Sequence, residues 1–485
     1  MEAHARGFDA ANTEAEKEIF TTTSSFTGKP IMRHTSMMTS LEEIMANSRL
    51  KRTMYRKTGT CTGGFCVGWN AMNVMWAVTS EMDQEYGTDY QERLKQWILH
   101  AQETGILVAG ALTDAKGDRS LKPSEQPNPD SSLHIVEYRE DGVVISGCKA
   151  MICGVAASEE IFLLPGSGYK DVDKDYALAC VVPRDINGLT IIECRHASDG
   201  RDLEEGSFDA PETGVTQAYL LFDRCFVPRD RVFMAGEAKY SGKVITYFTA
   251  NYRACIGACV AGQGDVMIGA GVLMARANGL SIKPFQDKMI NMAVNNETTY
   301  AVGVAAMAAG KPHASGPWIS DSRLAHTNKI HVATLPYETK RLCQEIGGGI
   351  VETGCFPSHK DFTDPKLGAL VQKYVKAGKD ISVLVEKLYN QMMNYRNQMT
   401  SIDASLAFAE EYLRMKNAAF LEGMSSSTDL IDAELNLAGV RTERLQAAYN
   451  FDLLLAQLLE AAGISDEFSA YARRADARPI LFDKK

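Results

Sequence analysis

The sequence predicts an α+β fold built in three successive parts: a helical N-terminal domain, a middle β domain and a C-terminal helical bundle. Apolar residues recur at helical spacing up to about residue 108 and alternate at period two between about 109 and 236. Helical spacing then returns and continues to the end of the chain. We therefore expect domains over residues 1–108, 109–236 and 237–485, an order typical of an α+β protein.

Two segments of the first domain carry helical apolar spacing. Ala71–Met82 is apolar-periodic, and Tyr90–Gln102 is amphipathic. The second segment runs into Gly105, a residue type that often stops helices because it tolerates a left-handed backbone. We expect both segments to be helices.

The middle domain alternates apolar residues between turn signals. Leu133–Tyr138 and Val143–Ile145 flank the sequence Glu140-Asp141-Gly142, a pattern that predicts a hairpin. Further strands are expected over Tyr176–Pro183, Leu189–Ile192 and Tyr219–Phe222.

The C-terminal part is organised around one apolar stretch, Asn251–Ala275. Small residues recur all around it, so we expect a central helix that packs closely on several sides. Its glycines predict a close neighbour, either another backbone or a flat cofactor. Arg253, Gln263 and Asp265 argue against a membrane span. Further helices are expected over Phe285–Ala309, Ile381–Met399, Ala404–Ala419 and Asp452–Ala462.

Composition narrows the classes of function. The chain has 485 residues, of which 45% are hydrophobic and 23% charged, as in ordinary soluble proteins. A formal net charge of −10 argues against a nucleic-acid surface, which needs a basic footprint. The N-terminus lacks the apolar segment of a signal peptide, so we expect a cytoplasmic protein with no membrane or nucleic-acid partner. Eleven cysteines, an odd number spread through apolar segments, then predict buried thiols or ligands rather than disulfides.

Three strings carry a resemblance that covers nearly the whole chain: Thr113–Arg119, Gly147–Gly154 and Phe222–Pro228. They resemble the family of 4-hydroxyphenylacetate 3-monooxygenase and 4-hydroxybutyryl-CoA dehydratase. Asp83–Thr88 and Pro336–Glu338 are more similar to the dehydratase branch. The resemblance implies an acyl-CoA dehydrogenase-like fold, in which the middle domain is a β-barrel.

The resemblance also implies FAD bound in homotetramers. The implied flavin-binding residues are Thr113, Lys116, Asp118, Arg119, Lys149, Cys153, Gly154, Gln344, Gly347, Gly348 and Gly349. A run of glycines lets the backbone approach a pyrophosphate, and lysine or arginine can offset its charge.

The dehydratase branch implies a [4Fe–4S] cluster. Its cysteine ligands are matched by Cys61, Cys66 and Cys259, with four residues between the first two where the family has three. The position of the histidine ligand, seven residues before Cys259, holds Tyr252. Two interpretations stay open: a non-standard cluster, for which Cys153 is an alternative ligand, and a set of ordinary buried thiols.

Five residues are candidates for catalysis. Tyr252 replaces a family base but, with an ordinary pKa of about 10, is a poor base at neutral pH. Gln217 stands where the family has a carboxylate, and Asp403 is a loosely matched C-terminal carboxylate. Arg253, if buried, needs a counter-charge such as a flavin phosphate or a substrate anion. Glu297 lies on a helix expected to be buried, where a hydrogen-bonded structural role with Tyr300 is the alternative.

The sequence leaves three hypotheses for the function of this protein. The first is a FAD enzyme that acts on an acyl-CoA or a related acid by dehydration, double-bond isomerisation or dehydrogenation. The second is a two-component monooxygenase that hydroxylates a phenol with FADH2 from a partner flavin reductase. The third is a flavin-binding scaffold that has lost its chemistry.

Overall fold

The computed structural model describes residues 17–59, 63–194, 217–281, 283–349, 361, 364–375 and 381–461. Its contacts divide the chain into two compact units. The first unit consists of Met1–Gly271 and Lys283–Val375, and the second of Val272–Ile282 and Lys376–Lys485.

The N-terminal part is mainly helical, as predicted. Its elements are α2 (Lys17–Phe20), β1 (Thr21–Thr23), β2 (Pro30–Met32), α3 (Leu41–Thr58), α4 (Phe65–Tyr86) and α5 (Tyr90–Thr104). The C-cap of α5 is Gly105 with φ 67°, which confirms the predicted stop. The short β1–β2 hairpin was not expected, because three-residue strands are too brief to show a period of two.

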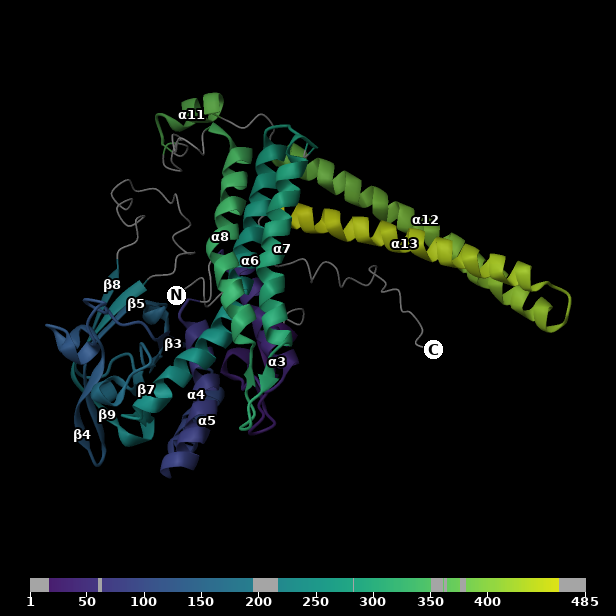
Figure 1. Ribbon diagram of the computed structural model, residues 1–485. Coiled ribbons are helices and arrows are strands. Elements are labelled where there is room, and N and C mark those ends of the chain that lie inside the picture. Colours follow the sequence, from purple (N-terminus) through teal and green to yellow (C-terminus); the bar gives the residue numbers. More distant parts are fainter. Residues whose placement is uncertain are drawn as a thin grey trace. The chain divides into compact units, whose positions relative to one another are not determined.

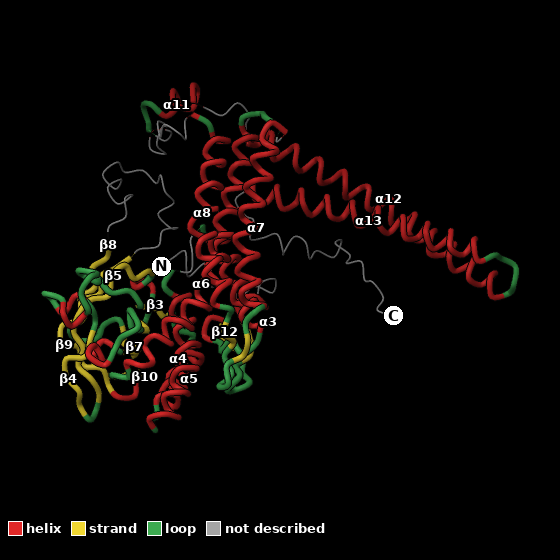
Figure 2. Tube along the Cα trace, in the orientation of Figure 1, coloured by secondary structure: helices red, strands yellow, loops and turns green. Residues whose placement is uncertain are grey.

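Two four-stranded sheets form the middle part. Figures 1 and 2 show their strands gathered in one region, beside α4. One has the order β10-β7-β6-β3, and the other has the order β4-β5-β9-β8. The first sheet contains β3 (Val108–Ala111), β6 (Glu160–Leu163), β7 (Leu178–Pro183) and β10 (Val232–Ala235). The second contains β4 (His134–Arg139), β5 (Gly142–Cys153), β8 (Leu189–Cys194) and β9 (Gln217–Pro228). The antiparallel β4–β5 pair confirms the predicted hairpin, and one apolar cluster draws on both sheets.

Helices then return in α6 (Ala238–Ala277), α7 (Gln286–Ala308), α8 (Ser322–Gly347) and α11 (Gly368–Val375). The two-residue strands β11 (Lys311–Pro312) and β12 (Trp318–Ile319) join α7 to α8. Figure 1 shows α6, α7 and α8 side by side.

The glycines of α6 have the close neighbours that the sequence predicted. A Cβ on Gly257 would meet the backbone of Thr299, and one on Gly264 would meet the Asn296 side chain. A Cβ on Gly262 would instead meet Tyr55 of α3. At these positions the neighbours are therefore other helices rather than a cofactor. Among the described residues, Ala238–Arg276 is the one helix long and apolar enough to cross a membrane, and its glycines pack on α3, α7 and α8.

The second unit contains α12 (Ile381–Leu421) and α13 (Ser427–Ala461), two long helices that pack against each other. The sequence predicted two helices where α12 is continuous, and it predicted only the end of α13. The residues between the two predicted segments, 400–403, continue the same helix.

Candidate active site

The N-terminus of α4 meets the end of β5 at a close backbone contact. A Cβ on Gly64 would overlap the carbonyl oxygen of Cys153, and a Cβ on Gly154 would lie 3.0 Å from the backbone nitrogen of Gly64. Gly154 itself has φ 72°, a conformation that glycine adopts without strain. The contact fixes Cys66, in the first turn of α4, beside the end of β5.

Thiols from three elements converge near this contact. Burial raises the pKa of the Cys153 thiol, and a charge on Cys66 raises it further. Burial likewise raises the pKa of Cys255, on which Lys51 and Cys66 also act. Cys66 therefore lies within electrostatic reach of both Cys153 on β5 and Cys255 on α6.

Tyr252 faces the same region from α6. Its ring stacks on Phe248 with centroids 5.4 Å apart and an interplanar angle of 15°. It also packs against the apolar cluster that contains Cys66 and Trp69. The residue at the family's histidine position thus lies close to Cys66, half-buried in an apolar setting.

Gln217 begins β9 directly opposite Cys153, its partner in the strand register. A hydrogen bond between the two side chains opposes the rise in the pKa of the Cys153 thiol. The structure therefore brings together these predicted residues: Cys66, Cys153, Gly154, Gln217 and Tyr252.

Lys51 is a member of this region that sequence reasoning missed. Its side chain is only 2% exposed, on the face of α3 that also carries Ile44, seven residues earlier. Ile44 belongs to a cluster with Cys255, and the charge of Lys51 opposes the rise that burial causes in the pKa of that thiol. The seven-residue spacing to a core isoleucine was the available signal, because it places both residues on one helix face.

Of the three predicted ligands of the iron–sulfur cluster, two lie within the described residues. Cys259 is buried on α6, one turn beyond Cys255, whereas Cys61 lies outside the described residues. Within the described part of the chain, no group of three or more His, Cys, Asp or Glu residues could hold a metal ion. The thiol chemistry of Cys66 and Cys259 suits an iron–sulfur cluster, but these two residues do not complete one.

The segment Thr113–Arg119 follows β3, with Asp114 buried and residues 115–119 exposed. Thr113 accepts a backbone hydrogen bond from Ala150 at 2.9 Å, and Asp118 accepts hydrogen bonds from the backbone and hydroxyl of Ser120. Lys116, at φ 70°, and Arg119 are exposed cations. The two cations fit the predicted contact with a pyrophosphate, since neither is engaged in an ion pair among the described residues.

Lys149 was predicted to bind the flavin, but its side chain is buried inside the β domain. Its ammonium group pairs with Asp114 at 2.7 Å and donates to the carbonyl oxygens of Leu112 at 2.9 Å and Leu164 at 2.8 Å. All three donors of the ammonium group are used inside the β domain, and the side chain is fully buried. We therefore expect Lys149 to hold the predicted flavin-binding loop in place through Asp114, a residue that the sequence did not single out.

Gly348 and Gly349, at the end of α8, are surrounded by open space. Gly348 has φ 78° and donates its N–H to Gln344 at 2.9 Å, and a Cβ on Gly348 or Gly349 would meet no atom within 4 Å. This geometry fits a close approach by a pyrophosphate. In Figure 1, however, the end of α8 lies away from β3 and β5. One chain does not bring the two predicted flavin-binding segments together.

The remaining candidates lie elsewhere. Glu297 was expected on a buried helix, but its side chain is 60% exposed and pairs with Arg52, whose guanidinium also covers the ring of Tyr300 at 4.9 Å. The expectation failed because only one face of α7 packs on other helices.

Asp403 belongs to the second unit, where it accepts a hydrogen bond from the buried Arg444 at 2.6 Å. Arg253 is half-buried on α6 and has no ion-pair partner among the described residues.

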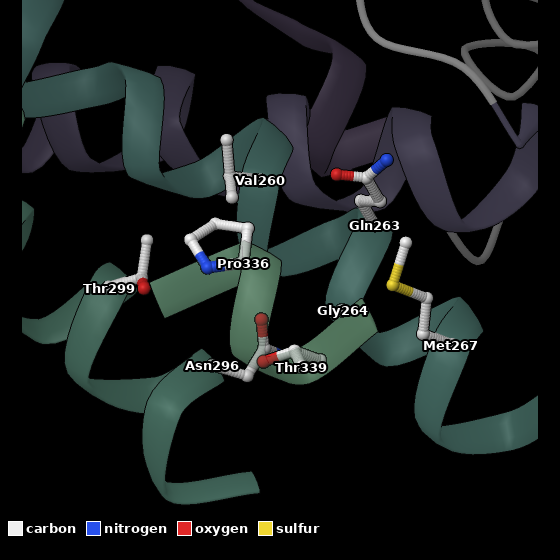
Figure 3. Close-up of a pocket in the computed structure, with 8 residues that line it drawn as sticks. All are labelled: Val260, Gln263, Gly264, Met267, Asn296, Thr299, Pro336 and Thr339. Atoms are coloured by element: carbon white, nitrogen blue, oxygen red, sulfur yellow. The ribbon is translucent and has the colours of Figure 1, made fainter. Parts of the chain in front are cut away.

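A small pocket lies between α6, α7 and α8 (Figure 3). Its lining residues are Val260, Gln263, Gly264, Met267, Asn296, Thr299, Pro336 and Thr339. Asn296 donates to Ala261 and Asp265, and both threonine hydroxyls donate to the backbone of their own helices. Pro336, which lies inside α8 and has no backbone N–H to donate, forms part of the lining.

Comparison with known proteins agrees with this architecture, which is that of the acyl-CoA dehydrogenase-like proteins. A 4-hydroxybutyryl-CoA dehydratase structure from N. maritimus matches with a TM-score of 0.74 and 38% identity, covering 78% of this chain and 75% of that one. The oxygenase component of 4-hydroxyphenylacetate 3-monooxygenase, solved with FAD, matches with a TM-score of 0.65 at 18% identity, over 78% and 77% of the two chains.

The chain belongs to the 4-hydroxyphenylacetate 3-hydroxylase family. The N-terminal region of that family matches residues 1–234, and its C-terminal region matches residues 241–385. Within it, 4-hydroxybutyryl-CoA dehydratase/vinylacetyl-CoA-Δ-isomerase of Clostridium aminobutyricum is 37% identical over 73% of both chains. The oxygenase component of 4-hydroxyphenylacetate 3-monooxygenase of Thermus thermophilus is 25% identical over 63% of both. The family resemblance inferred from the sequence is thereby confirmed.

Proposed function

We propose that this protein is a FAD-dependent enzyme that acts on an acyl-CoA or a related acid by dehydration, double-bond isomerisation or dehydrogenation. The observation that carries the proposal is the similarity to the dehydratase, which is higher in identity and longer in extent than the similarity to the monooxygenase. Bound FAD would supply the electron transfer that such reactions require.

Lys116 and Arg119 would hold the pyrophosphate of the flavin through their exposed cationic groups. Gly347–Gly349 offers open backbone for the same purpose, but at a distance from the β domain of its own chain. A second copy that supplies this segment would complete the site. We therefore include a cytoplasmic homotetramer in the proposal.

Where the start of α4 meets the end of β5, the residues of this chain would bind and orient the substrate. Tyr252 presents a phenol beside Cys66, and Gln217 presents an amide beside Cys153. Neither a phenol nor an amide is an effective base at neutral pH. Arg253 carries a half-buried positive charge that suits an anionic group of the substrate. This set differs from the dehydratase pattern, so the proposal extends to several acyl-CoA reactions rather than to dehydration of 4-hydroxybutyryl-CoA alone.

The proposal includes a non-standard [4Fe–4S] cluster with Cys61, Cys66 and Cys259 as ligands. Its support is the sequence positions of the three cysteines and the burial of the two that are described. None of the binding roles above depends on the cluster.

The decisive test is purification without oxygen, followed by a visible spectrum, iron and sulfide assays, and incubation with 4-hydroxybutyryl-CoA and vinylacetyl-CoA. We expect flavin bands and conversion of an acyl-CoA thioester, detected by mass spectrometry. A colourless protein that takes up no flavin would exclude the proposal. Flavin bands without iron or sulfide would remove only the cluster.

A second candidate is a two-component phenol monooxygenase, which the monooxygenase relatives favour. It would use FADH2 from a separate flavin reductase and would need no metal. Oxygen-dependent consumption of 4-hydroxyphenylacetate with supplied FADH2, together with inertness towards both acyl-CoA substrates, would establish it in place of the first proposal.

A further inference from the structure

Asn70 carries a buried oxygen atom to which no described residue donates a hydrogen bond. The residue lies on α4 and is 1% exposed. Its Nδ2 donates to the carbonyl oxygen of Cys66 at 2.7 Å, whereas its Oδ1 has no hydrogen-bond partner among the described residues. If the amide were flipped, Oδ1 would face the carbonyl oxygen of Cys66, and two acceptors cannot bond to each other. The hydrogen bond to Cys66 therefore fixes the orientation of the Asn70 amide.

A buried oxygen atom of this kind lowers the stability of the folded protein. A buried carbonyl group without a partner destabilises a protein by about 1–3 kcal/mol, and native structures rarely retain one without a reason. Asn73, three residues further along α4, shows the usual arrangement. Its amide donates to Ser36 and Trp69, and its oxygen accepts from the backbone nitrogen of Met38 at 2.6 Å.

The packing of α4 on α6 shows where Asn70 lies. The two helices run antiparallel, because Glu81 contacts Lys243 near one end and Cys66 lies near Cys255 at the other. Asn70 follows Cys66 by one turn, which places it on the α6-facing side, at the level of Tyr252. Asn70 is thus part of the candidate site, close to the half-buried tyrosine at its centre.

We propose that Oδ1 of Asn70 accepts a hydrogen bond from a hydroxyl group of the substrate. A carbonyl oxygen can only accept, so its ligand must present a donor, and a hydroxyl is the donor that hydroxyacyl thioesters and phenols share. The inference rests on the proposed function, because it assumes that the substrate binds beside Tyr252. Asn70 is then a positioning residue that selects hydroxylated over non-hydroxylated substrates.

The test compares dissociation constants within two pairs of compounds on the flavin-loaded protein without oxygen: 4-hydroxybutyryl-CoA with butyryl-CoA, and 4-hydroxyphenylacetate with phenylacetate. We expect the wild-type protein to bind the hydroxylated member of one pair about tenfold more tightly. In Asn70→Ala and in Asn70→Leu, which retains the branched shape of the side chain, the two members of that pair should bind equally.

Asn73→Ala is the matched control, because it removes bonded groups from the same helix and should lower the unfolding temperature without changing the hydroxyl preference. The proposal is overturned if the wild-type protein shows no preference in either pair, or if the Asn70 variants keep it. Failure of both Asn70 variants to fold would also overturn it, since each loses only the bond to Cys66. A preference confined to the phenol pair would retain the role of Asn70 while contradicting the acyl-CoA proposal.

Discussion

At the scale of single residues, burial decides which charged groups are available for binding. Lys149 and Asp114 are both almost completely enclosed, with side chains 2% and 3% exposed. Removing one member of a buried ion pair leaves an uncompensated charge in the interior, which is far more costly than losing an exposed pair. The pair therefore anchors the start of the predicted flavin-binding loop to β5.

We predict that Lys149→Met lowers the free energy of unfolding by about 3–5 kcal/mol, measured by urea denaturation. The double variant Asp114→Leu/Lys149→Met should recover much of that loss, because it removes both charges. Unchanged stability of Lys149→Met together with weaker FAD binding would contradict this role and place the ammonium group on the cofactor instead.

His34 makes stability depend on pH. Burial lowers its pKa to about 4, although its ring nitrogen Nε2 lies 3.2 Å from the carbonyl oxygen of Ile106. In the unfolded chain a histidine takes up its proton near pH 6.5, whereas in the folded protein His34 stays neutral until about pH 4. Between these values the unfolded state binds more protons, so stability falls as the pH is lowered.

We expect this residue to account for a loss of about 3 kcal/mol between pH 7 and pH 4. His34→Gln should therefore show a smaller fall in unfolding free energy over that range, measured by denaturation at a series of pH values. His100→Gln, at an exposed position, is the control and should keep the parent's pH dependence. An identical fall in His34→Gln and the parent would exclude the mechanism.

At the scale of elements, the site depends on how closely α4 approaches the β domain. Gly64 and Gly68 have no room for a Cβ, because Cys153 and Val108 place their carbonyl oxygens there. The position of Cys66 relative to β5 is thus set by backbone contact rather than by side-chain packing.

We predict that Gly64→Ala destabilises the protein by a few kcal/mol, because an overlap with backbone cannot be relieved by turning a side chain. Gly439→Ala on α13, where a Cβ would meet no atom within 4 Å, should be neutral or stabilise by about 0.5–1 kcal/mol. Thermal unfolding of both variants is the measurement. Equal behaviour of the two would show that α4 can move away from β5 without cost.

For the whole molecule, exposed apolar side chains point to assembly. On α13 the residues Ile431, Leu435, Leu445, Tyr449 and Leu453 are 39–64% exposed and share one face, opposite the face that packs on α12. Among the described residues nothing covers this face, and large exposed apolar patches mark interaction surfaces. The homotetramer of the proposal would cover it.

We therefore expect Leu435→Glu to lower the oligomeric state measured by light scattering, because it places a charge in that face. Asn436→Glu, an exposed neighbour off the apolar face, should leave the assembly unchanged. Retention of the parent's assembly by Leu435→Glu would show that this part of α13 does not contact another copy.

Much of this protein could be predicted from the sequence because the relevant signals are local. Apolar periodicity is a property of neighbouring residues, so it indicated the helix–β–helix order, the β4–β5 hairpin and the central helix α6. The strings around Thr113–Arg119 and Phe222–Pro228 were enough to indicate the family, since motif residues keep their spacing along the chain.

Only the tertiary structure decided which residues of the candidate site meet and in what state. It enclosed Lys149 with Asp114, exposed Glu297 and brought Cys66 beside Cys153. It also left one oxygen of Asn70 without a hydrogen bond from any described residue. Burial and hydrogen bonding at these positions depend on segments up to hundreds of residues away in the chain. Such long-range contacts leave no periodic trace in the sequence, so the residue types were readable in advance but their environments were not.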